Sequence, residues 1–418
     1  MREPARPSAF LFRQPILDRE QALAGYRLSF GGSEEVPEWK AAAALCATYG
    51  ELGMQGALGH HRAFLGIDAD FLQEDAIELL PPAGVVLELQ LDEPPDQAML
   101  KRCDCLRDRG YVLAITDYRG IDQRSRPLLP LVEIIKIRVG KADEDELREF
   151  AGSLRKLPVK LLAQDVDGHE QLQRCCRLGF DLFQGRCFAR AQIVSGRRLS
   201  ASQTALIRLL DLVERDVETP VIEDAFKHEP ALTLNLLRIV NAVGHRGRRL
   251  AQPVTSLRHA ITLFGRRQLR RWLSLLLFTP GDATADPSCS PLLQVAALRG
   301  RMLELLLETG PSAHHRNLAE LAFLTGILSM MPLALGLPIE EILEQIAVES
   351  EVRSALCRYD GLLGKLLALL QCFDNDDAIG CDRLLAVLPP TLALDRQDLN
   401  LALSLALRWL NGDCGQAP

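Results

Sequence analysis

Apolar and polar positions follow different patterns on the two sides of residue 195. Before it, short apolar runs of strand length alternate with longer amphipathic stretches. The runs predict eight strands, at Phe10–Ile16, Gly25–Phe30, Arg62–Ile67, Gly84–Gln90, Tyr111–Thr116, Glu133–Arg138, Val159–Ala163 and Asp181–Gln184. The stretches predict helices at Glu38–Tyr49, Asp70–Leu80, Gln97–Arg109, Glu144–Leu154 and Gly168–Leu178. This alternation predicts an α/β fold, and a closed barrel if the eighth strand pairs with the first.

After residue 195 the strand signal disappears, and Leu- and Ala-rich segments with helical periodicity replace it. They predict helices at Glu223–Val243, Val254–Phe278, Leu292–Glu308, Leu318–Leu335 and Ile339–Ala347. Pro230 fits a first helical turn, and Gly265 is expected to divide the second of these segments into two helices. We therefore expect an α/β domain over residues 1–195, a connecting helix over 196–216 and an all-α domain over 217–418.

Charge and composition exclude several classes of protein. The net charge of -7 gives no basic field for DNA or an anionic membrane. No apolar stretch approaches the roughly 18 residues of a membrane span, and the opening MREPARPSAF has no apolar core of a secretory signal. The eleven cysteines are scattered without C-x-x-C spacing. We expect a cytoplasmic protein with free thiols, no cofactor and no metal; a homo-oligomer is possible.

Five segments of the first half carry a resemblance. They are FLFRQPILDREQALAGYRLSF, LAITDYRG, EIIKIRVG, LLAQDVDG and LGFDLFQGRCFAR, in that order from residue 10 to residue 190. This half resembles the EAL phosphodiesterase domains. The resemblance implies a TIM-type barrel that hydrolyses cyclic di-GMP, using two metal ions held by carboxylates at the carboxyl ends of the strands.

Position by position, the resemblance implies that most of the acids are lost. Acidic positions of the family fall at Arg27, Thr116, Arg138 and Gln164, and an asparagine ligand falls at Gly66. Glu88, Asp117, Lys136 and Gln184 keep the residue type of the family. A cation at an acidic position repels a metal. The resemblance is therefore to a degenerate EAL barrel without hydrolysis, in which we expect Arg27 or Arg138 to pair with Glu88 or Asp117.

The polar set at the barrel mouth has three interpretations at this point. Its members are Arg27, Glu88, Asp117, Lys136, Arg138, Gln164 and Gln184. In the first, they are inherited polar residues whose hydrogen bonds and charges are satisfied within the barrel mouth. In the second, they form a vestigial metal-free pocket that binds a nucleotide phosphate. In the third, they form a protein interface. Arginine supports the second interpretation, because its guanidinium binds phosphate in a bidentate geometry. No catalytic residue is assigned.

The second half carries a further resemblance over residues 220–278. Its elements are Glu229-Pro230, a Leu-rich helix that reaches Asn241, and a turn from Ser256 to Gly265 with Phe264 before the glycine. This pattern resembles the HDOD domain, a helical relative of metal-dependent HD phosphohydrolases. The catalytic His-Asp pair of those enzymes would fall at Thr325-Gly326, so the resemblance implies no catalysis here.

Four arginines stand out in this half: Arg266, Arg267, Arg270 and Arg271. Their spacing puts them on one face of a helix whose other face is apolar. They form either a solvated face or a docking surface for an acidic partner or a phosphate-bearing ligand.

Together, the two halves predict a non-enzymatic bacterial signal-transduction adaptor that binds other signalling proteins. The alternative is a metal-independent cyclic di-GMP sensor without hydrolysis. A residual phosphohydrolase is a third possibility with less support.

Overall fold

The computed structural model describes residues 10–31, 61–90, 93–120, 122–140, 142–185, 201–247, 254, 256–278, 291–308, 313–392 and 394–410. Contacts divide the chain into two units, one of residues 1–190 with 369–418 and one of residues 191–368. This division differs from the boundaries expected from the sequence, because the last fifty residues group with the barrel rather than with the helical half.

The first unit contains a closed eight-stranded barrel, so the predicted barrel is confirmed. Its strands are β1 (Phe10–Leu17), β2 (Leu23–Gly31), β3 (Arg62–Ile67), β4 (Val85–Leu89), β5 (Val112–Ile115), β6 (Ile134–Arg138), β7 (Lys160–Gln164) and β8 (Leu182–Gln184). Strand β1 runs antiparallel to both neighbours and the others are parallel; Ile16 opposite Gln184 closes the ring. Each strand lies within two residues of its predicted bounds.

Three of the predicted helices are confirmed in this unit: α4 (Gln97–Asp108), α5 (Glu144–Leu154) and α6 (His169–Leu178). The predicted helix Asp70–Leu80 is wrong. The segment forms the short α3 (Ala69–Leu72) and a 3₁₀ turn at Asp75–Leu79. The Tyr111 hydroxyl lies 3.0 Å from the Ile77 carbonyl and 2.7 Å from that of Leu80. The Ile77 carbonyl also accepts the Leu80 N–H, which closes the 3₁₀ turn. Glu38–Tyr49 lies outside the described residues.

The interior of the barrel has an apolar layer, followed by a polar layer toward the carboxyl ends of the strands. The buried cluster inside comprises Ile16, Phe64, Val86, Val112, Ala114, Ile134, Leu162 and Leu182. Side chains two residues apart on a strand share a face. The next inward positions toward the carboxyl ends are therefore Gly66, Glu88, Thr116, Lys136, Gln164 and Gln184. This register places the polar set at the mouth of the barrel.

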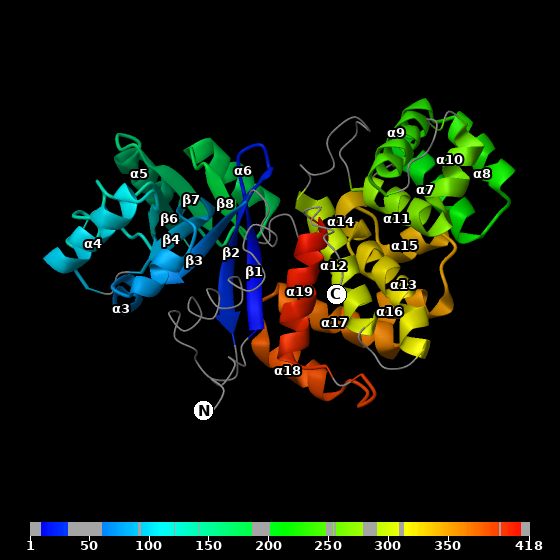
Figure 1. Ribbon diagram of the computed structural model, residues 1–418. Helices are drawn as coiled ribbons and strands as arrows, with labels where there is room; N and C mark the ends of the chain where they lie inside the picture. Colours follow the sequence, from blue (N-terminus) through cyan, green and yellow to red (C-terminus); the bar gives the residue numbers. More distant parts are fainter. Residues whose placement is uncertain are drawn as a thin grey trace. The chain divides into compact units, whose positions relative to one another are not determined.

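The last described helix packs against the first strand of the barrel. Figure 1 shows α19 (Arg396–Leu410) alongside β1. Asn400 accepts a hydrogen bond of 2.8 Å from the Leu11 backbone N–H, and the Phe373 ring lies 5.3 Å from that of Phe12. Strand β8 pairs only with Ile16 and Leu17 of β1. The C-terminal segment therefore binds a part of β1 that β8 does not reach.

The second unit is all-α, as predicted. Its helices are α7 (Ala201–Glu214), α8 (Thr219–Lys227), α9 (Pro230–Gly247), α10 (Leu257–Phe264), α11 (Arg266–Leu276), α12 (Pro291–Glu308), α13 (Ala313–Leu328), α14 (Met331–Leu335), α15 (Ile339–Glu344), α16 (Ser350–Arg358) and the first turns of α17 (Gly361–Asp374). Pro230 begins α9, and Gly265, at φ +77°, separates α10 from α11 as expected. Among the described residues, α18 (Ala378–Ala386) belongs to the first unit.

Two polar residues of the HDOD-like pattern have structural roles. Asn241 accepts a 2.7 Å hydrogen bond from the Val254 N–H and donates to the Val254 carbonyl at 3.0 Å. Ser256 caps the N-terminus of α10. Both side chains therefore fix how the chain enters α10.

One expectation about apolar segments is wrong. Leu318–Leu335, with a mean hydropathy of 1.8, is long and apolar enough to cross a membrane by length and composition. It covers most of α13 and all of α14, and 67% of it is buried within the structure. Such burial is typical of a core helix rather than of a lipid-facing span.

Candidate functional site

A cavity of about 240 Å³ opens at the mouth of the barrel. Six strands or the residues directly after them supply its lining, which comprises Arg27, Gly66, Glu88, Gln90, Thr116, Asp117, Lys136, Arg138 and Gln164. Six of the seven residues predicted for the pocket are therefore in the lining. The seventh, Gln184, is buried and is not part of the lining, and its role in binding stays a prediction.

The centre of the cavity is a buried ion pair. Lys136 Nζ lies 2.6 Å from Glu88 Oε1, and both side chains are at most 2% exposed. Arg27 Nε lies 3.6 Å from the other oxygen, Glu88 Oε2. Burial lowers the pKa of Lys136 from its ordinary value, and the Glu88 carboxylate opposes that shift. Both oxygens of Glu88 therefore face a cation.

A second ion pair lies at the rim of the cavity. Arg138 lies 3.0 Å from Asp117 and 3.5 Å from Asp165, and its side chain is 55% exposed. Asp117 and Asp165 have φ of +49° and +63°, so turns directly after β5 and β7 bring these carboxylates toward Arg138. From the sequence, Arg27 or Arg138 was expected to pair with Glu88 or Asp117. Both arginines do so, Arg27 with Glu88 and Arg138 with Asp117.

Gln14 is a neighbour of this site that sequence reasoning missed. It accepts a hydrogen bond from the buried Gln184 side chain across the β1–β8 seam. Gln14 also lies opposite Arg27 in the pairing of β1 with β2. The alternation of side chains along β1 could have identified Gln14, because residues two positions apart on a strand point to the same face and Ile16 points inward.

These residues do not fit a pair of divalent metal ions. Among the described residues, no group of three or more His, Cys, Asp or Glu side chains could hold a metal. Glu88, the best-placed carboxylate, already binds Lys136 and Arg27. Two-metal sites need several converging oxygens that are available for coordination. The chemistry of this cavity must therefore be argued from its cations and amides.

The arginine face of α11, which was expected to be exposed, is only partly so. The Arg267 side chain is 52% exposed, whereas the other three are at most 31% exposed. Glu304 of α12 is fully buried and lies 2.9 Å from Arg267 and 2.6 Å from Arg301. Arg271 also pairs with Glu304, and its guanidinium lies 4.1 Å from the Phe323 ring centre. Only 14% of the Arg271 side chain is exposed. The helical pattern located a cationic face but could not show that α12 supplies its anion.

The other two arginines hold α7 to α11. Arg270 lies 2.7 Å from Glu214, and Arg266 lies 3.0 Å from Asp216. Arg266 also donates to the Val217 carbonyl. All four arginines therefore pair within the helical unit, and their role in docking stays a prediction.

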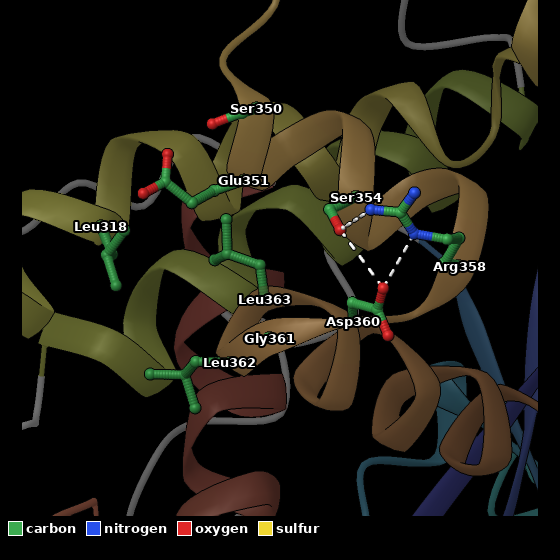
Figure 2. Close-up of a pocket in the computed structure, with 9 residues that line it drawn as sticks. All are labelled: Leu318, Ser350, Glu351, Ser354, Arg358, Asp360, Gly361, Leu362 and Leu363. Carbon is green, nitrogen blue, oxygen red and sulfur yellow. Dashed lines mark hydrogen bonds and ion pairs between the residues drawn. The ribbon is translucent and has the colours of Figure 1, made fainter.

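A second, larger cavity of about 410 Å³ lies in the helical unit among α13, α16 and the start of α17. Figure 2 shows that three of its polar side chains, Ser354, Arg358 and Asp360, bind one another. Arg358 lies 2.8 Å from Asp360 and 2.9 Å from the Ser354 hydroxyl. The side chain of Arg358 is 70% exposed, so solvent screens this pair. We therefore place the candidate functional site at the barrel mouth.

Known proteins resemble this chain over nearly its whole length. It is 26% identical over 416 residues to a protein of Vibrio cholerae serotype O1 named cyclic di-GMP phosphodiesterase CdgJ. The match covers 96% of this chain and 92% of that protein. It is also 24% identical to the uncharacterized protein YuxH of Bacillus subtilis, over 90% of this chain and 93% of that one. No family model matches the chain.

Solved structures resemble the barrel only distantly. A standalone EAL protein of Vibrio cholerae O395 with bound cyclic di-GMP aligns at a TM-score of 0.37 and 18% identity, over 45% of this chain and 93% of that one. The manganese and cyclic di-GMP complex of Klebsiella pneumoniae BlrP1 aligns at 0.36 and 18%, over 44% of this chain and 56% of that one.

These comparisons support the EAL-like part of the resemblance and correct the expected function. The similar protein of nearly the same length is named a phosphodiesterase, which contradicts both a non-enzymatic adaptor and a sensor without hydrolysis. The HDOD assignment, the cytoplasmic location and the signalling partners stay predictions.

Proposed function

We propose that this protein is a cyclic di-GMP phosphodiesterase whose barrel mouth receives the nucleotide. The observation that carries the proposal is the similarity to the named phosphodiesterase over 96% of this chain. A similarity of that extent includes the helical half, so the proposal concerns the whole protein rather than the barrel alone.

The chemistry of the cavity supports this function. Arg27, Lys136 and Arg138 are the groups that bind phosphate oxygens through charge-assisted hydrogen bonds. Thr116 and Gln164 add neutral polar groups at the same level. The volume of about 240 Å³ is below the roughly 300–1,000 Å³ of pockets that enclose a drug-sized ligand. The cavity therefore suits one phosphodiester with its adjoining sugar, and the bases would lie outside it.

The test is conversion of cyclic di-GMP to the linear dinucleotide by the purified full-length protein, followed by chromatography. We expect product to accumulate in proportion to protein. Gly66→Leu places a side chain in the cavity and should abolish most of the conversion. Gly152→Leu is the matched control, because a Cβ there meets no atom within 4 Å.

Two results would overturn the proposal. One is the absence of product in Mg²⁺, in Mn²⁺ and in chelator alike. The other is equal conversion by Gly66→Leu and Gly152→Leu, because the activity would then not reside at the barrel mouth.

A further inference from the structure

We infer that the protein binds cyclic di-GMP without a divalent metal, because Arg27, Lys136 and Arg138 supply the positive charge at the phosphodiester. This inference rests on the proposed function and specifies what the nucleotide contacts at that same site.

The first support is the occupation of Glu88. Its two carboxylate oxygens lie 2.6 Å from the Lys136 ammonium and 3.6 Å from the Arg27 guanidinium. A Mg²⁺ ion coordinates oxygen at about 2.0–2.1 Å and requires octahedral space. Its entry at Glu88 would displace an ammonium whose side chain is 2% exposed, and would leave that charge without its partner. The geometry therefore opposes metal binding at the one fully buried carboxylate of the cavity.

The second support is the formal charge of the lining. Its three cations and two carboxylates carry a net charge of +1. Reversal of an arginine to an acid lowers this value by two, and a neutral-to-acid change lowers it by one. With acids at the positions of Arg27, Thr116, Arg138 and Gln164, the lining would carry a net charge of −5. Two bound divalent cations would bring that net charge to −1. The lining thus carries a positive charge without any added ion, and Asp165, which is not part of the lining, offsets it only at the rim beside Arg138.

The third support is the accessibility of the rim cation. Arg138 is 55% exposed, and its partners Asp117 and Asp165 are 35% and 45% exposed. Exposed ion pairs contribute little to stability, so exchange of a carboxylate for a phosphate costs little. Arg27, at 27% exposure, lies between the buried pair and the opening. A phosphodiester can therefore meet Arg138 first and Arg27 deeper in the cavity.

The direct test is calorimetric titration of the full-length protein with cyclic di-GMP, in excess Mg²⁺ and in chelator. We expect dissociation constants that agree within about twofold. Arg27→Gln and Arg138→Gln should each weaken binding by about tenfold or more in chelator. Arg107→Gln is the matched control. Arg107 is 40% exposed near the end of α4, just before β5 begins, and so lies at the opposite end of the barrel.

A second test asks whether restored acids create a metal site. Mn²⁺ binding is measured in the absence of nucleotide, from the decrease in the electron paramagnetic resonance signal of free Mn²⁺. We expect no Mn²⁺ binding that depends on Glu88 in the natural protein. Arg27→Glu with Arg138→Asp should bind Mn²⁺ at least tenfold more tightly. If this variant does not fold, the comparison of Mg²⁺ with chelator decides the matter on the natural protein alone.

The outcomes separate the inference from the proposed function. Binding of cyclic di-GMP that strengthens tenfold or more in Mg²⁺ would overturn the inference and leave the proposed function intact. Mn²⁺ binding by the natural protein that is lost in Glu88→Gln would also overturn the inference. No binding of cyclic di-GMP under either condition would refute the proposed function itself.

Discussion

Replacement of Glu304 by glutamine should destabilise the helical unit more than any exposed charge change within it. Glu304 is fully buried on α12, and three arginines surround it: Arg267 at 2.9 Å, Arg301 at 2.6 Å and Arg271. Glu304→Gln keeps the volume of the side chain and removes only its charge. The three guanidiniums would then converge on a neutral amide and repel one another.

The magnitude follows from how much solvent each guanidinium retains. Removal of one partner of a wholly buried ion pair costs about 3–5 kcal/mol, whereas an exposed pair contributes about 0–1 kcal/mol. Arg271 and Arg301 are 14% and 21% exposed, and Arg267 is 52% exposed. Burial already lowers the pKa of Arg271, and Glu304 opposes that shift. We therefore expect a loss of about 3 kcal/mol in the free energy of unfolding, at the lower end of the buried range.

The assay is urea unfolding of the full chain, reported by the fluorescence of Trp272. Trp272 packs on Phe226 in this unit, so Trp39→Phe and Trp409→Phe make the signal specific. At about 2 kcal/mol per molar urea, the midpoint should fall by about 1.5 M. Glu308→Gln is the control, because Glu308 is 41% exposed and contacts only Arg301 among these arginines. Equal midpoints for Glu304→Gln and Glu308→Gln would refute the reasoning.

Two further predictions concern the C-terminal segment and the connecting helix. Asn400→Ala should lower the unfolding free energy of the barrel unit by about 1 kcal/mol, because the Leu11 N–H loses its acceptor. Asn375→Ala, at the exposed end of α17, is the control. Equal losses in the two variants would contradict the prediction. Burial raises the pKa of Glu214 from 4.5 to about 7 despite Arg270, with Glu320, Glu349 and Asp211 nearby. The contribution of Glu214 to stability is therefore full below pH 4.5 and lost as the pH rises through about 7. Between pH 4.5 and about 7, urea titrations should show Glu214→Gln gaining stability relative to the natural protein. A constant difference across the interval would contradict this.

Local pattern predicted the elements well where one rule decided the outcome. Eight apolar runs became eight strands, since each has the length and burial of a barrel strand. Gly265 divided two helices because its φ of +77° is open to glycine. The pattern failed at Asp70–Leu80, where the hydroxyl of Tyr111, about thirty residues away, binds the carbonyls of Ile77 and Leu80. No local signal contains that contact.

The C-terminal segment shows the same limit on a larger scale. Its helices have the Leu-rich periodicity of the helical half, so periodicity alone groups them with that half. The contacts of Asn400 with Leu11 and of Phe373 with Phe12 join residues more than 350 positions apart. A helical pattern shows which face is apolar but not what that face covers.

The candidate site was easier to predict than the arginine face, and the reason is geometric. The alternation of strands in a closed barrel brings Glu88 and Lys136 to the same mouth. The sequence therefore predicted which residues meet there, although it expected an arginine rather than Lys136 as the nearest partner of Glu88. Helices impose no such common end, and the four arginines of α11 gave no information about Glu304 on α12. Both places consist of a buried carboxylate surrounded by cations. The difference that decides function is that the cations of the barrel line a cavity, whereas Arg271 lies against Phe323 and the buried Glu304. A cation is available to a ligand only where its internal partner leaves room beside it.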